Sequence, residues 1–334
     1  MGVIMAYGLM RRAAIICAAL IASCGVAASQ PVYPVRPITL VVPFAPGGPT
    51  DVVGRLVAQG LSRSMGQPVI VENVAGNSGV TGSARVARAA ADGYTLVVGN
   101  LGTHAAASAI QRSIPYDPRT DFAPIGVIAA NPMLLIASPK VTADGLPAFI
   151  AHVRANAPRL NFGSAGVGAT SHLACALFNS LIGVEVTHVP YRGTAPVLTA
   201  LIAGEIDYGC DQTAGALPQV LAGTVKGVAI ATPRRSPAAP DLPTGSEQGL
   251  EGFQASAWNA LFAPKGTPPA IIARLAEALD NILLDEMNAA TFAELGAELP
   301  MPVERGPAAL AKLVAEEMPR WAEIVRAARI APVP

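Results

Sequence analysis

Short apolar strands alternate with helices along this chain, and this alternation constrains its fold more than any other feature. The predicted strands span residues 38–42, 69–71, 94–98, 160–162, 184–189, 206–209 and 225–231. The predicted helices of the same region begin near Thr50, where the hydroxyl can cap the first turn, and span 79–91, 170–181 and 195–203. Strand-then-helix repetition is typical of open parallel sheets covered by helices, so we expect an α/β fold.

Two such blocks followed by a helical tail predict two lobes. The tail contains predicted helices at 271–284 and 307–328 and has no sheet of its own to cover. We therefore expect it to pack on the first lobe, so that lobe 1 comprises 30–134 plus 260–334 and lobe 2 comprises 135–259. The chain then crosses between lobes near 134–136 and near 257–262. This arrangement predicts a cleft with a hinge, and open α/β sheets bind ligands beyond the carboxyl ends of their strands.

The N-terminus has the pattern of a secretory signal peptide. Arg11 and Arg12 precede an apolar run at 13–22, and small residues follow at 26–29. The run is too short to span a bilayer. We expect a leader over 1–29, cleaved near Ala28 or Ser29, and an exported, periplasmic mature chain. Two alternatives stay open: a lipoprotein anchored at Cys24, and a true start at Met10.

Charge and cysteine content narrow the class further. The chain of 334 residues has 23 basic and 23 acidic side chains. This balance argues against a nucleic-acid binder, which would carry a basic surplus. Cys175 and Cys210 are the cysteines of the expected mature chain. In an oxidising compartment they either form a disulfide or remain two small buried thiols, and the sequence leaves both open.

Two glycine-rich loops each stand between a predicted strand and a predicted helix. They are residues 44–51 (FAPGGPTD) and 163–172 (GSAGVGATSH), and a weaker third is 99–103 (GNLGT). Glycines let the backbone approach a ligand, and the amides at a helix start favour an anion. Two such loops in facing lobes predict a site for a small carboxylate. Glycine-rich turns also commonly connect strands to helices without binding a ligand, and that alternative stays open.

Enzyme, cofactor and metal signatures do not emerge from the sequence. Phe162 stands where a nucleophile elbow needs glycine, and residues 166–171 lack the third glycine of a dinucleotide fingerprint. The four histidines show no metal-ligand spacing. His172 and His188 belong either to the cleft or to the structural core, with a structural role favoured for His188. Asp211 follows a strand, where it either accepts from a ligand or caps the next helix.

Motifs spread over nearly the whole mature chain resemble one family, the tripartite tricarboxylate transporter solute-binding proteins (Bug, or TctC-like, receptors). They are residues 33–38 (YPVRPI), 42–51 (VPFAPGGPTD), 71–73 (VEN), 92–96 (DGYTL), 116–118 (YDP), 162–166 (FGSAG), 188–193 (HVPYRG), 216–218 (ALP), 240–244 (PDLPT) and 263–268 (APKGTP). The resemblance implies a two-lobed periplasmic binding protein of type II, the Venus-flytrap fold. It also implies capture of a small organic acid, without a cofactor or metal, for a membrane permease with a large and a small subunit.

The resemblance also nominates ligand-binding residues. They are Phe44, Gly47, Gly48, Asp51, Ser164, Gly168, Thr170, Ser171 and Asp211. Asp51 is expected to act as a cap or loop brace, because its charge repels an anion. Cys210, and Cys175 in its helix, depart from the family pattern, which puts the identity of the ligand in doubt.

The function expected on these grounds is that of a monomeric, non-enzymatic solute-binding protein. A sensor that presents its closed form to a membrane histidine kinase is the first alternative. An exported α/β enzyme is the second, disfavoured because no nucleophile–base pair or metal set emerges.

Overall fold

The structure, a computed structural model, describes residues 33–111, 113–327 and 330. The expected leader over 1–29 and Cys24 lie outside these residues. Residues 33–35 group with the N-terminal segment, so the fold described below is that of the unit from Arg36 onward. Within the described residues, no helix is both long and apolar enough to cross a membrane.

The first group of strands is parallel, as the sequence predicts. Strand β1 (Ile38–Val42) lies between β2 (Val69–Asn73) and β3 (Thr95–Asn100), with Leu40 opposite both Val71 and Leu96. The connections are α2 (Pro49–Met65) after β1, and η1 (Asn77–Gly79) with α3 (Val80–Ala87) after β2. Helix α2 corrects one expectation, because Gly48 is its N-cap and Thr50 already lies in the first turn. Pro49 sets this start, since its fixed φ and missing N–H suit the first helical position.

The second group repeats this arrangement. Strand β5 (Asn161–Ser164) lies between β6 (Thr187–Pro190) and β7 (Tyr208–Gln212), all parallel. Its helices are α5 (Leu146–Asn156), α6 (Thr170–Leu181), α7 (Thr194–Ala203) and α8 (Thr213–Leu221), with one-turn helices η3 (Ala157–Arg159) and η4 (Ser246–Gln248). Strand β8 (Lys226–Ile230) pairs with β4, which is described next.

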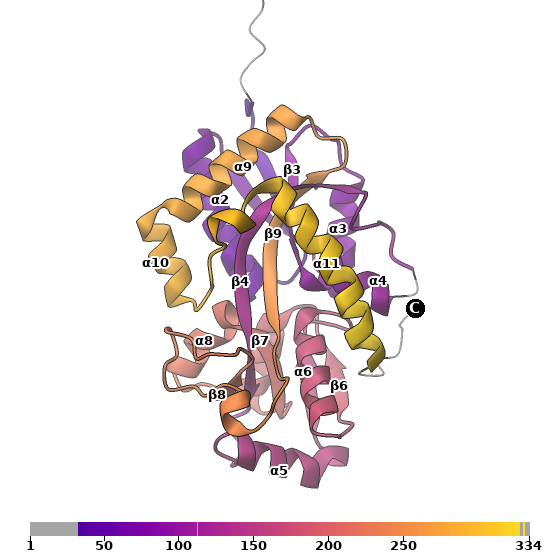
Figure 1. Ribbon diagram of the computed structural model, residues 1–334, viewed down its shortest axis with the longest axis vertical. Coiled ribbons are helices and arrows are strands. Elements are labelled where there is room, and N and C mark those ends of the chain that lie inside the picture. Colours follow the sequence, from indigo (N-terminus) through magenta and orange to yellow (C-terminus); the bar gives the residue numbers. More distant parts are fainter. Residues whose placement is uncertain (1–32, 112, 328–329, 331–334) are drawn as a thin grey trace, which may run out of the picture. The chain divides into compact units, whose positions relative to one another are not determined.

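Two long antiparallel strands, β4 (Phe122–Ala137) and β9 (Ser256–Pro264), connect the two groups (Figure 1). The sheet order is β2-β1-β3-β9-β4-β7-β5-β6, and β9 is antiparallel to both β3 and β4. The expectation of an open parallel sheet is therefore wrong for the centre of the molecule. Pro124 and Pro132 hide β4 from prediction, because proline is unusual in a central strand. Register shifts near Gly126 and Ala129 accommodate the irregular strand. The predicted crossings near 134–136 and 257–262 fall on β4 and β9.

The helical tail packs on the first group, as predicted. Helix α9 (Pro269–Leu284) lies against α2, and α10 (Glu286–Glu294) follows it. After η5 (Pro302–Glu304), helix α11 (Gly306–Ala327) packs on β4 and on the segment formed by η2 (Gly102–Ala106) and α4 (Ala107–Ile110). The side chains that α11 buries are Leu310, Val314, Trp321 and Val325. Their spacing of four and seven residues predicts this buried face.

Candidate functional site

A small cavity lies where four helices begin. Its volume is about 20 Å³, enough for about one water molecule. It is lined by Phe44, Gly48, Pro49, Thr50, Asn100, Met133, Ala165, Ala169, Thr170, Ser171, Thr194, Asp211 and Gln212. These residues include the starts of α2, α6, α7 and α8. The first amides of a helix have no partner within the helix and carry a partial positive charge, so four helix starts together favour an anion. Among the residues that the structure describes, no lysine, arginine or histidine lines the cavity.

The first glycine loop is held by Asp51, which is 3% exposed. Its carboxylate accepts hydrogen bonds from the Gly47 amide and from the side chains of Asn73 and Arg55, each at 2.8 Å. Asn73 also donates to the Phe44 carbonyl at 3.0 Å. Burial raises the pKa of Asp51, but the hydrogen bonds outweigh it and hold the pKa below its ordinary value. Asp51 thus braces the loop, and the Gly47 amide is directed at this carboxylate.

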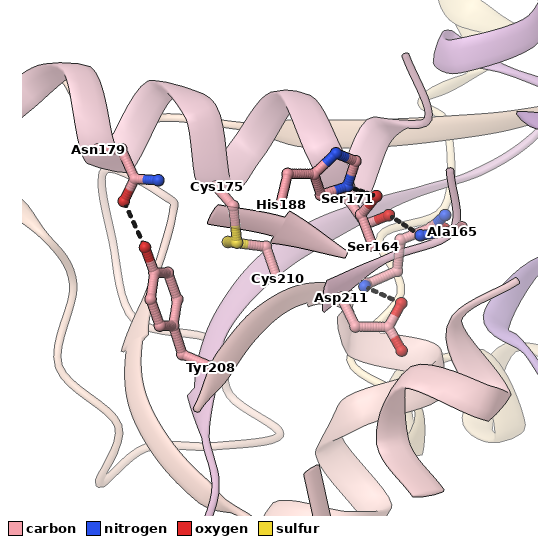
Figure 2. The surroundings of a disulfide bond; sticks show 10 residues. Ser164, Ala165, Ser171, Cys175, Asn179, His188, Tyr208, Cys210 and Asp211 are labelled. Atoms are coloured by element: carbon pink, nitrogen blue, oxygen red, sulfur yellow. Dashed lines mark hydrogen bonds between the residues drawn. A yellow bond between two sulfur atoms is a disulfide. The ribbon is translucent and has the colours of Figure 1, made fainter. Parts of the chain in front are cut away.

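The second glycine loop is held by hydroxyl groups of its own sequence. Ser171 accepts from the Ala165 amide at 2.9 Å (Figure 2). Ser164 accepts from the Gly166 amide at 3.1 Å. Gly166 and Gly168 adopt φ values of +120° and +87°, which side chains other than hydrogen rarely tolerate. The Gly168 amide donates to Nδ1 of His172 at 3.2 Å. These bonds fix the backbone that leads into α6.

Two histidines stand behind this loop. Nε2 of His188 lies 2.6 Å from Oγ of Ser164, and the His172 and His188 rings are 4.3 Å apart between centroids. Burial lowers the pKa of His172 to about 3 and that of His188 to about 4, and for His172 the neighbouring imidazole adds to the effect. Both are therefore neutral at physiological pH. Neither lines the cavity, so they support the loop from behind.

Two polar side chains at the cavity have an unpartnered atom. Oγ1 of Thr170 and Oδ2 of Asp211 are fully buried and have no hydrogen-bond partner among the described residues. A buried polar atom without a partner is costly, and these two atoms at the cavity are available to hydrogen-bond a ligand.

A disulfide joins Cys175 of α6 to Cys210 of β7, with a Cα–Cα distance of 5.6 Å (Figure 2). Of the two alternatives left open by the sequence, pairing is therefore the correct one. Cys210 directly precedes Asp211, and Cys175 lies in the helix that begins at Thr170. The crosslink thus connects two elements that contribute to the cavity wall.

The structure divides the nominated residues into two sets. Five of them line the cavity: Phe44, Gly48, Thr170, Ser171 and Asp211. The other four shape the loops around it: Gly47, Asp51, Ser164 and Gly168. The main residues that sequence reasoning did not nominate are Asn100, Met133, Thr194 and Gln212. Asn100 belongs to the third glycine-rich segment, residues 99–103, so the sequence contained a signal that could have identified it. Met133 lies in strand β4, which the sequence did not predict, and no local pattern distinguishes Met133 as a site residue.

Comparison with known proteins decides the family. The family described as TctC, the tripartite tricarboxylate transporter family receptor, matches residues 53–330. The chain belongs to this receptor family. The structure of MatC from Rhodopseudomonas palustris with bound malate is similar at a TM-score of 0.85 and 44% identity, covering 88% of this chain and all of that chain. The structure of R. palustris Rpa4515 with adipate is also similar, at a TM-score of 0.87 and 36% identity, and the match covers 90% of this chain and all of that chain.

A third structure, that of the periplasmic binding protein BugD, has a TM-score of 0.87 and 36% identity, again over 90% of this chain and all of that chain. This TctC receptor therefore has the two-lobed α/β fold of periplasmic binding proteins, as the sequence predicts. It is a solute-binding receptor, and the cavity at the four helix starts is its candidate ligand site.

Proposed function

We propose that this TctC receptor captures a small organic acid in the cavity at the starts of α2, α6, α7 and α8. The observation that carries this proposal is that four helix N-termini converge there. Among the described residues, the lining also contains the hydroxyl of Thr170, which has no partner, and contains no basic side chain. Backbone amides and hydroxyls then hold the carboxylate. The nominated set Phe44, Gly47, Gly48, Asp51, Ser164, Gly168, Thr170, Ser171 and Asp211 acts partly by contact and partly by shaping the loops.

The structurally similar proteins support a carboxylate ligand. MatC was solved with malate and Rpa4515 with adipate, and both compounds are dicarboxylates. We extend this class, and not either compound, to the present chain.

Ligand entry requires the lobes to separate, because a cavity of about 20 Å³ is smaller than any dicarboxylate. We place lobe 1 at 30–134 plus 260–334 and lobe 2 at 135–259, with the hinge in β4 and β9. Contacts between the lobes then include Ser78 with Val167 and Thr213 with Gly296. A ligand that binds the closed arrangement better shifts the population toward it.

The remaining parts of the proposal concern where and with what the receptor works. A leader over 1–29 directs the chain to the periplasm, where it acts as a monomer without catalysing a reaction. The closed receptor delivers its ligand to a membrane permease with a large and a small subunit. The basis for these points is the leader pattern and membership of the family.

A thermal-shift screen of residues 30–334 tests the proposal. Dicarboxylates of four to six carbons are compared with diamines and polyols of equal length. A ligand at 100 times its dissociation constant stabilises the folded state by about 2.7 kcal/mol, which raises the Tm by several degrees. Mass spectrometry of the denatured protein first establishes that no ligand has co-purified. Stabilisation by diamines or polyols, with none by any acid, contradicts the proposal.

A further inference from the structure

Asp211 is a buried carboxyl group at the cavity that has one oxygen without a partner. The residue is 1% exposed, and Oδ1 accepts from the Gln212 amide at 2.8 Å. Oδ2 has no hydrogen-bond partner among the described residues. A β-carbon added at Gly215 would lie 2.6 Å from Oδ2 and 3.0 Å from Cδ of Pro49, so Oδ2 sits between α8 and the start of α2. Figure 2 shows the carboxyl directed away from the disulfide.

No cationic side chain in the described part of the chain compensates this carboxyl group. The elements packed against β7 are β4, β5, α6, α7 and α8. Their described residues include one ionisable side chain outside the disulfide, His172 of α6, and it stacks with Phe162 and is neutral. Strand β7 itself carries Tyr208, whose hydroxyl donates to Asn179. From α2, Asp51 and Arg55 are paired with each other. An ionised Asp211 would therefore be a buried charge without a cationic side chain beside it, which is disfavoured. Only the helix starts would offset it, and those are the groups that the ligand carboxylates need.

A dicarboxylate ligand makes an ionised Asp211 still less favourable. If Asp211 were ionised, two carboxylates would share one small, dry cavity, and like charges at such distances do not both remain ionised. A fully ionised dicarboxylate without a hydroxyl or amino group, such as succinate or adipate, has no O–H or N–H with which to satisfy Oδ2. The hydrogen bond at this point must then be donated by Asp211 itself.

We propose that Asp211 binds the organic acid in its protonated form and donates Oδ2–H to a ligand oxygen. This inference rests on the proposed function, because it requires the ligand to be a carboxylate. The receptor then takes up a proton together with the anion. Burial supports this state, since it raises the pKa of Asp211 to about 7 against the opposing hydrogen bond of the Gln212 amide. A group of this kind is poised to be neutral near physiological pH.

The consequence is a pH-dependent affinity. Above about pH 7.5 a small dicarboxylate is fully ionised, because its second carboxyl group titrates about one to two units above the ordinary value near pH 4. Once the pH exceeds the pKa of Asp211 in the ligand-free receptor, each further pH unit weakens binding up to tenfold. The same range shows uptake of about one proton per ligand bound.

Titration calorimetry with succinate, malate and adipate from pH 6.5 to 9 tests this inference. Buffers of different ionisation enthalpy give the proton count. The variants are Asp211→Asn, whose amide donates without titrating, and Asp211→Ala, which cannot donate. Glu205→Gln is the matched control, because Glu205 is an exposed carboxylate just before β7. We expect D211N to bind with no pH dependence and at least tenfold tighter than wild type at pH 9. D211A should bind weakly at every pH, and E205Q should keep the wild-type slope.

Two results overturn the inference while the proposed function stands. One is a wild-type affinity that does not change with pH. The other is a D211N variant that loses as much affinity as D211A, together with tighter binding of aspartate than of succinate, because Asp211 then accepts from a cationic ligand group. A ligand-free wild-type protein that binds no carboxylate at any pH overturns the proposed function, and the inference with it.

Discussion

Cys175 in α6 and Cys210 in β7 form a disulfide across the sheet-to-helix interface, immediately behind the cavity wall (Figure 2). Both cysteines are fully buried, among side chains that include Phe162, Phe178 and Tyr208. The crosslink therefore holds the helix that begins at Thr170 against the strand that carries Asp211.

Removing this crosslink should lower stability substantially. The bond closes a loop of 35 residues, and the chain-entropy model assigns about 3 to 4 kcal/mol to a loop of that length. The C175A/C210A double variant should lose that amount of unfolding free energy in urea titrations. Wild type refolded in reductant is the control, because it keeps both sulfur atoms without the bond. A loss below about 1 kcal/mol in both samples would contradict the expected role.

The hydroxyl of Thr170 should matter for the ligand and not for the fold. Its Oγ1 has no partner within the described structure, so Thr170→Val removes no intramolecular hydrogen bond. We expect unchanged stability and a five- to tenfold weaker carboxylate affinity, equivalent to about 1 kcal/mol, measured by calorimetry.

Thr213→Val is the matched control for this variant. Thr213 is also fully buried, but its hydroxyl donates to the Gly296 carbonyl at 2.8 Å, and its side chain does not line the cavity. This variant should lose about 1 kcal/mol of stability, and its affinity should fall about as much as that of Ser78→Ala, because this bond also joins the proposed lobes. The assignment of Thr170 to the ligand fails if T170V destabilises the fold as T213V does and leaves affinity unchanged.

Ser78 should stabilise the closed arrangement of the proposed lobes. Its hydroxyl donates to the Val167 carbonyl at 2.6 Å, although its φ of +54° is unfavourable for a residue with a side chain. Ser78→Ala should therefore weaken ligand binding about three- to tenfold through the lost hydrogen bond.

Ser78→Gly separates binding from backbone strain. It loses the same hydrogen bond, so affinity should fall equally. Glycine relieves the left-handed conformation, so S78G should be more stable than S78A by about 1 kcal/mol in urea. Affinities of both variants equal to wild type would show that this bond does not contribute to closure.

Stability should decrease on acidification from pH 6.5 to 5. Burial lowers the pKa of His104, like that of His172, to about 3, and that of His188 to about 4. In this window all three histidines bind a proton only in the unfolded state, so their contribution to stability is complete above pH 6.5 and is lost as the pH falls. Asp211, with its pKa raised to about 7, binds a proton only in the folded state and acts in the opposite direction. The net difference of two protons corresponds to about 2.7 kcal/mol per pH unit.

Urea titrations at pH 5, 5.5, 6 and 6.5 measure this slope. Asp211→Asn removes the opposing proton and should steepen the slope by about 1.4 kcal/mol per pH unit. Stability that rises on acidification in wild type, by about 1.4 kcal/mol per pH unit, would mean that the histidines keep their ordinary pKa values in the folded state and that only Asp211 contributes.

The sequence alone determined most of the secondary structure and the position of both glycine loops. Strand β1 and helix α6 have the predicted bounds, because a continuous apolar run and a helical pattern after a glycine loop are local signals. Phe44, Gly48, Thr170 and Ser171 at the cavity follow from those loops, since strand ends and helix starts lie at one edge of a parallel sheet.

Tertiary structure decided which of the nominated residues reach the cavity. Gly47 and Ser164 form hydrogen bonds within their own loops and do not line it, and Asp51 braces its loop as its charge led us to expect. The antiparallel centre formed by β4 and β9, the choice of a disulfide over two thiols, and the unpartnered oxygen of Asp211 all depend on segments far apart in the chain. Local patterns specify which elements form, whereas pairing, burial and charge compensation arise only when those elements pack together.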